Sequence, residues 1–190
     1  MGRAKHFNEN LVTKKALLVF IKKGYEATSL KDLEKATGLK PGSFYHSFGN
    51  KQSMFLRVIN YYIEEVVIAR INTYLSSEQP IQGIKSLFTS TFESPARARC
   101  GCLLVNTAVE VGIGNAKIHK RIMYGFHLFE EAFTKQIEKA RQLGLLKTKQ
   151  KTSSLVKQLL LSYQGILVMV KITRDKQTLK KVTDDALSII

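Results

Sequence analysis

The sequence predicts an all-α protein of about nine helices, and three observations lead to this fold class. Apolar residues recur at spacings of three and four along most of the chain, which is the periodicity of amphipathic helices. Sustained strand-like alternation is absent, and only three prolines occur in 190 residues. With 44% apolar residues, the chain has enough material for these helices to enclose a core.

The first two helices have recognisable starts and stops. The first is expected over about residues 8 to 23 and ends at Gly24, since glycine commonly follows the last turn of a helix. Ser29 is expected to open the second as a capping box with Asp32, in which hydroxyl and carboxylate satisfy unpaired N–H groups at the helix start. This short helix stops by Gly38.

Proline and glycine also place the later helices. Pro41 is expected at the start of a third helix, because the first turn needs no proline N–H. A fourth helix begins after Gly49 and Asn50, and residues 76 to 80 are linker-like. Five more helices are expected near residues 81–94, 102–112, 115–143, 152–173 and 176–188.

The charge of the chain favours partners that carry phosphate. Thirty Lys and Arg against fifteen Asp and Glu give a net charge of +15, which suits nucleic acid or an anionic membrane surface. Residues 1–57 hold eleven basic and four acidic residues, so the positive charge is about twice as dense there as in the rest of the chain.

Membrane insertion and export are not expected. The most apolar region, residues 159–170, is about 12 residues long, whereas roughly 20 are needed to span a bilayer. The N-terminus lacks the apolar stretch of a signal peptide. Two cysteines close together, Cys100 and Cys102, fit a reducing compartment. We therefore expect a soluble, cytoplasmic protein without a membrane partner.

Residues 29–48 have the pattern of a helix-turn-helix unit. Two short helices are joined by the turn Thr37-Gly38-Leu39, and in such units the second helix enters the major groove of DNA. Phe44 and Phe48 lie four residues apart and are expected to pack inward. The donors available to DNA on and after this helix are Lys40, Ser43, Tyr45, His46 and Lys51.

The segments GYEATSLKDL (24–33) and GLKPGSFYHSFGNK (38–51) resemble the DNA-binding domain of the TetR family of bacterial transcriptional regulators. The resemblance covers roughly residues 10–60. It implies a DNA-binding domain, taken as residues 1–50, and a larger helical domain, residues 51–190, that binds a small-molecule effector and dimerises. The expected function is that of a repressor released from a palindromic double-stranded DNA operator by an effector of unknown identity or by thiol modification.

The resemblance also assigns roles to single positions. Thr28 and Ser29 match the phosphate-contacting start of the second helix, and Lys51 matches a lysine at the start of the fourth. The positions that match the recognition helix are Lys40, Gly42, Ser43, Tyr45 and His46. Ser47 departs from the family, in which many members have an aromatic residue or histidine there.

Side-chain chemistry divides these positions into two groups. Tyr45, Thr28 and Lys51 suit phosphates, which fix register without reading sequence. The side chains placed for base edges are those of Lys40, Ser43 and His46. Gly42 lets the backbone approach closely. The plainer alternatives are a solvated lysine at position 51, a half-buried tyrosine at 45 and a surface histidine at 46.

The pair Cys100 and Cys102 has three interpretations. A helix N-terminus and the neighbouring Arg97 and Arg99 raise the thiolate content, so either thiol can sense oxidants or electrophiles. Cys102 precedes an apolar run and equally suits ordinary core packing. Metal binding is the third interpretation, but two ligands do not complete a zinc site, so no metal or cofactor is expected.

An effector pocket is expected between helices of the second domain. Aromatic walls with a few polar groups are typical of such pockets. The candidates for its lining, beside Cys100 and Cys102, are Phe88, Phe92, Val105, Phe126, Phe129 and Tyr163. The alternative is that this aromatic stripe belongs to the core.

The last two helices are expected to form a homodimer, because they offer more apolar surface than one small domain hides. The residues concerned are Leu155, Leu159, Tyr163, Ile166, Val170, Leu179, Val182, Ala186 and Ile190. Two-fold symmetry then places two recognition helices on a palindrome.

Two other classes of function compete with a regulator. An enzyme is disfavoured because His6, His46, His119 and His127 have no adjacent carboxylate or nucleophile and no glycine-rich phosphate loop occurs. A nucleoid-type protein that binds DNA without sequence preference is the stronger rival.

Overall fold

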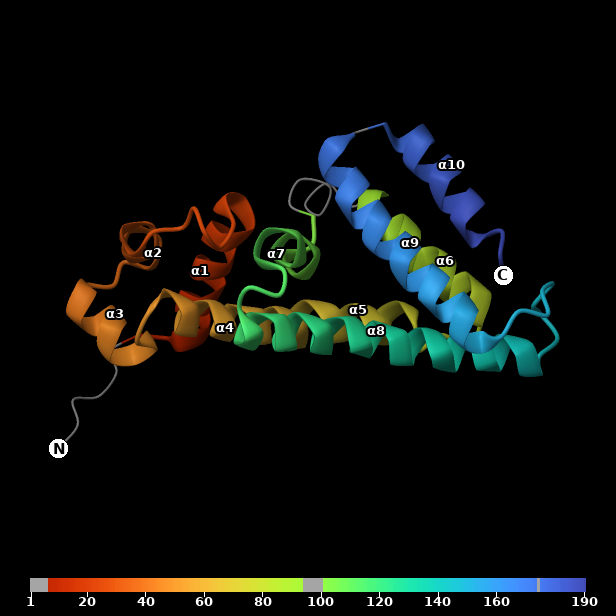
Figure 1. The fold of residues 1–190 in the computed structure, drawn as a ribbon, viewed down its shortest axis with the longest axis horizontal. Coiled ribbons are helices and arrows are strands. Elements are labelled where there is room, and N and C mark those ends of the chain that lie inside the picture. The colour runs from red at the N-terminus through yellow and green to blue at the C-terminus, as the bar shows by residue number, and fades with distance from the viewer. Residues whose placement is uncertain (1–6, 94–100, 174) are drawn as a thin grey trace.

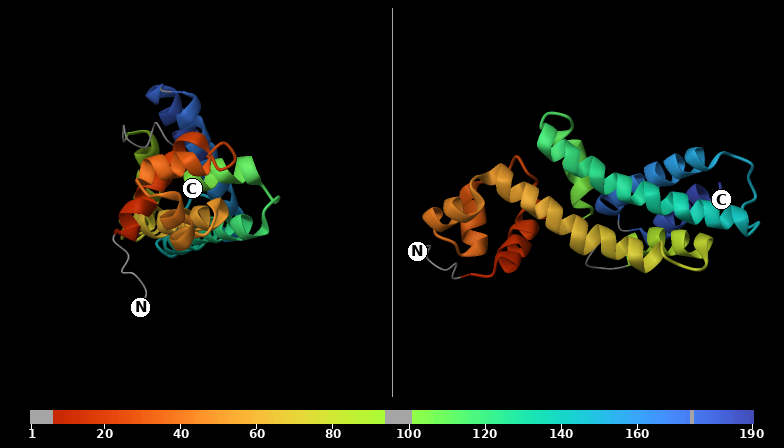
Figure 2. Two further views of the ribbon diagram at one scale, coloured as in Figure 1. Left: turned by 90° about the vertical axis from the view of Figure 1, so that its left-hand side faces the viewer. Right: turned by 90° about the horizontal axis from the view of Figure 1, so that it is seen from below.

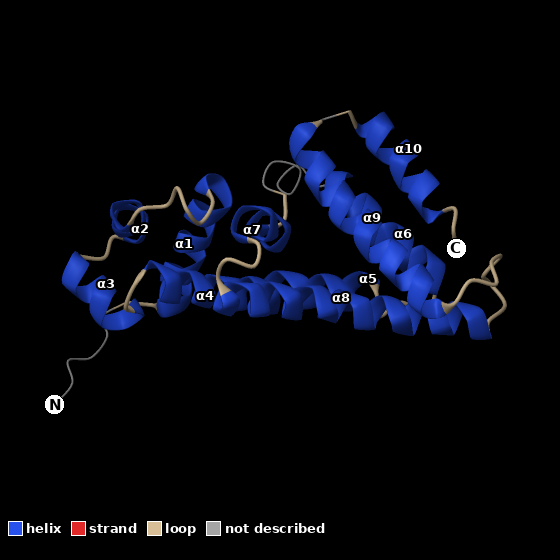
Figure 3. Ribbon diagram, viewed as in Figure 1, coloured by secondary structure: helices blue, strands red, loops and turns tan. Residues whose placement is uncertain are grey.

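All regular structure is helical in the computed structural model, which describes residues 7–93, 101–173 and 175–190 (Figure 1; Figure 3). The elements are α1 Glu9–Lys23, α2 Leu30–Thr37, α3 Pro41–Phe48, α4 Lys51–Tyr62, the π-helical segment η1 Ile63–Ile68, α5 Ala69–Tyr74, α6 Pro80–Glu93, α7 Leu103–Val111, α8 Ala116–Gln142, α9 Thr152–Ile172 and α10 Lys176–Leu187. Because α4, η1 and α5 continue without a break, the described residues form nine separate helices. The predicted fold class is confirmed.

Local capping explains where α1 begins and where α2 begins and ends. The Asn8 side chain caps α1 by accepting a hydrogen bond from the Leu11 N–H. Ser29 and Asp32 form the predicted capping box, with both reciprocal hydrogen bonds present. Gly38 ends α2 at a φ of +76°, in the left-handed region that glycine enters without steric cost.

Helices α1, α2 and α3 form a unit that we call the head, residues 7–50. Its core is aromatic: the Phe20 and Phe55 rings lie 4.6 Å apart, and those of Phe44 and Phe48 lie 5.6 Å apart. Phe55 comes from α4, so the fourth helix closes the base of the head. Leu33 is fully buried in the same core.

The continuous helix α4–η1–α5 connects the head to the remaining helices, which we call the body. Figure 2 shows it running from the head into the body, with α8 beside it over much of its length. In Figure 1, α7 lies between the head and the group formed by α6, α9 and α10. The widening to π-helix over Ile63–Ile68 has no counterpart in the sequence prediction, which treats this stretch as ordinary helix.

Helix α9 is longer than the apolar segment that the sequence suggested. It is 21 residues long, and an 18-residue window within it has a mean hydropathy of 1.4, which satisfies length and composition for crossing a membrane. The expectation of an apolar region far too short to span is therefore wrong for this helix. One such helix is weak support for a membrane protein, and one face of α9 packs on α6, α8 and α10.

Most of the apolar stripe expected at the dimer interface lies inside the chain. Its α9 residues Leu155, Leu159, Tyr163, Ile166 and Val170 are all buried, as are Leu179 and Ile190, whereas Ala186 is half-buried and Val182 is 41% exposed. Helix α9 turns this stripe toward the body core and exposes a second set of apolar side chains on its opposite, outward face. On the outward face, Leu161 is 67% exposed and Ile172 is 73% exposed.

Candidate nucleic-acid interface

Helix α3 separates its apolar and polar residues onto two faces. Phe44 is 0% exposed and Phe48 is buried beside it in the head. The five predicted recognition positions are all exposed: Lys40, Gly42, Ser43, Tyr45 and His46. Lys40 is the N-cap of α3 and Tyr45 is 50% exposed, so donors stand along the helix from its first turn. This is the presentation that a recognition helix requires.

The surface at Gly42 is open. A Cβ atom placed there would have no other atom of the described residues within 4 Å. None of these residues therefore requires glycine at this position, and the open surface leaves space for another molecule to approach the backbone.

Thr28 and Ser29 have partners within the head. Thr28 is 1% exposed, and its Oγ1 donates to the Gly24 carbonyl at 2.6 Å. The Ser29 hydroxyl donates to Asp32 at 2.8 Å within the capping box. A hydrogen bond from Lys23, with further bonds from Ser29, holds the pKa of Asp32 well below its usual range. The phosphate contacts of Thr28 and Ser29 stay predictions, and their hydroxyls stabilise the start of α2.

Lys51 ties α4 to the loop between α1 and α2. Its Nζ donates to the carbonyls of Tyr25 at 3.0 Å and Glu26 at 3.3 Å. The same ammonium lies 4.6 Å from the centre of the Tyr25 ring, within the range of a cation–π contact. The alternative of a solvated lysine does not describe this side chain. An ammonium has three donors, so two bonds to the loop leave one donor for the predicted phosphate contact.

Glu110, at the C-terminal end of α7, holds the opposite side of this loop. Its two carboxylate oxygens accept hydrogen bonds from the N–H groups of Tyr25 and Glu26, each at 2.8 Å. Gly24 has a φ of +84°, and a Cβ atom there would lie 2.7 Å from the Glu110 carboxylate. The loop at residues 24–26 is thus fixed by α4 through its carbonyls and by α7 through its amides, which joins the body to the head.

Replacing Glu110 with alanine is expected to weaken operator binding about fivefold, because two charge-assisted hydrogen bonds, together worth ~1 kcal/mol in this exposed setting, no longer orient the head. Fluorescence anisotropy with labelled operator DNA measures the change. The control is Glu65→Ala, which removes the same charge from an exposed position on η1. Equal affinities of the two variants would show that Glu110 does not position the head.

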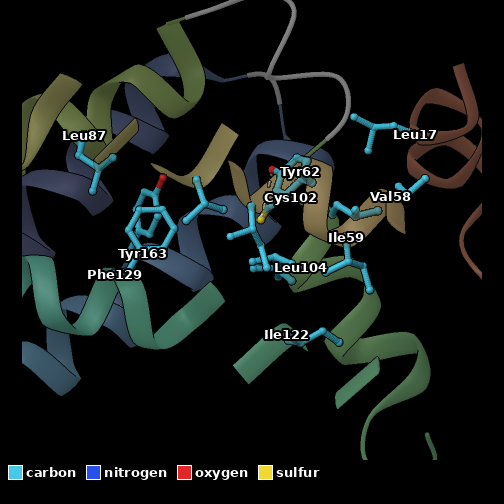
Figure 4. Packing of buried hydrophobic residues seen from close by; sticks show 14 of the residues in the cluster. Leu17, Val58, Ile59, Tyr62, Leu87, Cys102, Leu104, Ile122, Phe129 and Tyr163 are labelled. Carbon is cyan, nitrogen blue, oxygen red and sulfur yellow. Dashed lines mark hydrogen bonds between the residues drawn. The ribbon is translucent and has the colours of Figure 1, made fainter. Parts of the chain in front are cut away.

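A cavity of about 250 Å³ lies between head and body. Figure 4 labels five of the residues that line it, Leu17, Tyr62, Cys102, Phe129 and Tyr163, within the buried cluster around them. The head supplies Leu17, Leu18 and Ile21 from α1. The body supplies apolar walls from η1, α8 and α9 and polar groups from five side chains, which are those of Tyr62, Arg70, Thr91, Cys102 and Tyr163. An occupant of this cavity would contact both domains.

Two of the six apolar and aromatic residues predicted for the pocket line this cavity, namely Phe129 and Tyr163. Val105 lines a separate cavity between α1, α7 and α9, and Phe126 lines a groove between α8 and α9. Phe88 and Phe92 are buried in the core, as the alternative interpretation expected. Helical spacing identified apolar residues, but it did not show which of them face empty space.

Of the two predicted sensor thiols, one lies in the described part of the chain. Cys102 is the N-cap of α7, is 6% exposed and accepts a hydrogen bond from the Tyr62 hydroxyl at 3.5 Å. Cys100 lies outside the described residues. Burial of Cys102 agrees with the packing interpretation, and its proximity to the cavity keeps sensing as a prediction.

Histidines were expected to lack neighbouring carboxylates, and His127 departs from this. On the exposed surface of α8 its ring nitrogens lie 3.7 Å from Glu130 and 3.3 Å from Glu131. His6 lies outside the described residues. Within the part of the chain that the structure describes, no group of three or more His, Cys, Asp or Glu is placed to hold a metal ion.

The head and the exposed face of α3 together define a helix-turn-helix DNA-binding protein. Comparison with known sequences gives the family. The model of bacterial regulatory proteins of the tetR family matches residues 12–58, and that of the Tetracyclin repressor-like C-terminal domain matches residues 80–185. The chain belongs to the TetR family and is a DNA-binding transcriptional regulator.

Similar proteins agree with this assignment. The uncharacterized HTH-type transcriptional regulator YezE of Bacillus subtilis (strain 168) is 29% identical over the full length of both chains. The HTH-type transcriptional repressor ComR of Escherichia coli (strain K12) is 34% identical over 55% of this chain and 51% of its own. The TetR family regulator CifR, solved with operator DNA, has the same fold at a TM-score of 0.85, with 23% identity and 98% of each chain covered.

Proposed function

We propose that this protein is a cytoplasmic, homodimeric repressor without catalytic activity that leaves a palindromic operator when a small molecule binds between head and body. The observation that carries this proposal is the cavity lined by α1 of the head together with η1, α8 and α9 of the body. A ligand that binds one orientation of the head more tightly than another shifts the conformational equilibrium toward the orientation that it prefers. A ligand with equal affinity for both orientations leaves the equilibrium unchanged.

The outward face of α8 and α9 supports a two-fold dimer. Leu161, Val168 and Ile172 on α9 and Met123 and Tyr124 on α8 are exposed apolar side chains. Several large apolar side chains exposed on neighbouring helices are typical of a protein interaction surface. Pairing this face with the same face of a second copy buries it and places two heads symmetrically for two half-sites of one operator.

The division at residue 50 is part of the same proposal. Residues 1–50 carry all the predicted DNA contacts except that of Lys51, the first residue of α4, and residues 51–190 carry the cavity walls contributed by the body and the outward apolar face. Helix α4 packs on α1, so the first helix of the second unit also supports the first.

Footprinting on the DNA that flanks the gene tests the proposal. A regulator protects a discrete palindrome, whereas a nucleoid-type protein protects all of the DNA equally. Binding should also weaken steeply with salt, because the two N-terminal segments of a dimer, residues 1–57 of each copy with a net charge of +7, release counterions from phosphates. Uniform protection at every sequence would contradict the proposal.

Replacing Lys40 with alanine is expected to lower affinity for the protected site by ~1–3 kcal/mol, about 5- to 150-fold, and to relax preference at one base pair in each half-site. The reason is its position at the N-cap of α3, where base-edge contacts are made. Lys35→Ala, which removes an exposed lysine of α2, is the control. Binding to a set of operator variants measures both effects, and loss of affinity without change in preference would reassign Lys40 to phosphate.

A further inference from the structure

The cavity wall contains a buried cation. Arg70, in the first turn of α5, is 6% exposed and lines the cavity. Its Nε donates to the Tyr163 hydroxyl at 3.0 Å. Its Nη2 donates to the Leu87 carbonyl at 3.0 Å and to the Ser90 hydroxyl at 2.8 Å. The guanidinium also lies 5.4 Å from the centre of the Tyr74 ring.

This cation has no anionic partner in the protein. All fifteen Asp and Glu of the chain lie in the segments that the structure describes, and no ion pair among those segments includes Arg70. Neutral oxygens and aromatic faces offset only part of the free energy of burying a guanidinium, which stays charged at any ordinary pH. The Nη1 group makes no hydrogen bond to a described residue. A negative charge brought into the cavity would complete the site.

The rest of the wall specifies a compact apolar body for such an anion. Leu18, Val66 and Leu167 contribute aliphatic surface, and Phe129 contributes an aromatic face. A cavity of roughly 150 Å³ is known to hold benzene, and this one measures about 250 Å³. The space therefore suits one ring or a short chain with a small polar group.

Tyr62 supplies a second polar group to the wall. Among the residues that the structure describes, its hydroxyl donates only to the Cys102 sulfur, at 3.5 Å, and sulfur is a weak acceptor. Burial raises the pKa of the Tyr62 phenol well above its usual range, so the group stays a neutral donor. A carboxylate in the cavity is a better acceptor than the thiol.

We propose that the effector is a small organic monocarboxylate with a compact apolar body, whose carboxylate pairs with Arg70. This inference rests on the proposed function in one respect, namely that the cavity between head and body is the effector site. It adds the chemical class of the ligand and the residue that selects it.

The experiment compares pairs of probes that differ in charge and hardly in shape. Phenylacetate is matched with phenylacetamide, and hexanoate with hexanamide. Binding to the full chain is measured by calorimetry at pH 7, where both acids are ionised. We expect at least one carboxylate to bind ten times or more tightly than its amide, and we expect Arg70→Met, which keeps the apolar stem and removes the charge, to lose that preference.

Each result has a defined meaning. Equal binding within both pairs, preference for the amides, or no binding of any of the four probes would overturn the proposal, and none of these readings needs a variant to fold. A preference that survives in a folded Arg70→Met protein would also overturn it. The proposed regulatory function is judged separately, by the footprint of the wild-type protein without any probe.

Discussion

Replacing Phe44 with alanine is expected to lower the free energy of unfolding of the head by about 3–5 kcal/mol, the usual cost of deleting a buried aromatic side chain. The ring is 0% exposed and contacts the ring of Phe48 in a head built from three short helices. A loss of this size is a large fraction of the total stability of a small domain. Urea unfolding followed by circular dichroism measures it, and operator binding should disappear with the folded head.

The adjacent residue provides a matched control. Tyr45 is 50% exposed, and its ring meets that of Phe44 edge to face at 6.2 Å. Tyr45→Ala should leave the free energy of unfolding within about 0.5 kcal/mol of the wild type, as surface substitutions usually do. It should nevertheless weaken binding to every DNA sequence about tenfold, through loss of a phosphate contact. If Tyr45→Ala destabilised the head as Phe44→Ala does, the assignment of inward and outward faces of α3 would be wrong.

Replacing Leu161 with glutamate is expected to convert the proposed dimer into monomers. Leu161 is 67% exposed in the chain, and the proposed two-fold axis would bury it against a second copy. The substitution places one carboxylate per subunit in an apolar interface, and an unpaired buried charge costs about 3–5 kcal/mol. The dimer dissociation constant should therefore rise by at least about 100-fold. Sedimentation at several protein concentrations measures it.

Operator affinity should fall together with dimerisation, since one head contacts one half-site only. The control is Ile113→Glu, in the connection between α7 and α8, where the native side chain is 84% exposed and belongs to neither α8 nor α9. If the Leu161→Glu protein remained dimeric, the dimer interface would not lie on the outward face of α9, and α10 would be the next helix to test.

Signals that act within a few residues made the head predictable. The capping box of Ser29 and Asp32, the left-handed Gly38 and the opening position of Pro41 set the helix boundaries through contacts inside one turn. The spacing of Phe44 and Phe48 set which face of α3 turns inward. These residues determine the local conformation almost independently of the remaining chain, so the sequence contains the necessary information.

Features that join distant segments were not predictable in the same way. Glu110 reaches a loop 84 and 85 residues earlier in the chain, and Arg70 bonds to Tyr163, 93 residues later. Helical periodicity marked the buried stripe of α9, but the choice between a core and a dimer interface depends on which helices cover it. The apolar periodicity of one sequence does not show which other helices pack against that stripe.

The position of the cavity limits how freely the parts of this protein can be exchanged. Leu17, Leu18 and Ile21 belong to the head, which carries the predicted DNA contacts of α3, yet they form part of the cavity wall. A chimera that joined the first 50 residues of another regulator to residues 51–190 of this one would change the lining of the cavity as well as the preferred operator. Ligand preference and operator preference therefore cannot be exchanged independently between proteins. A chimera that keeps the original ligand preference must retain the α1 residues that line the cavity.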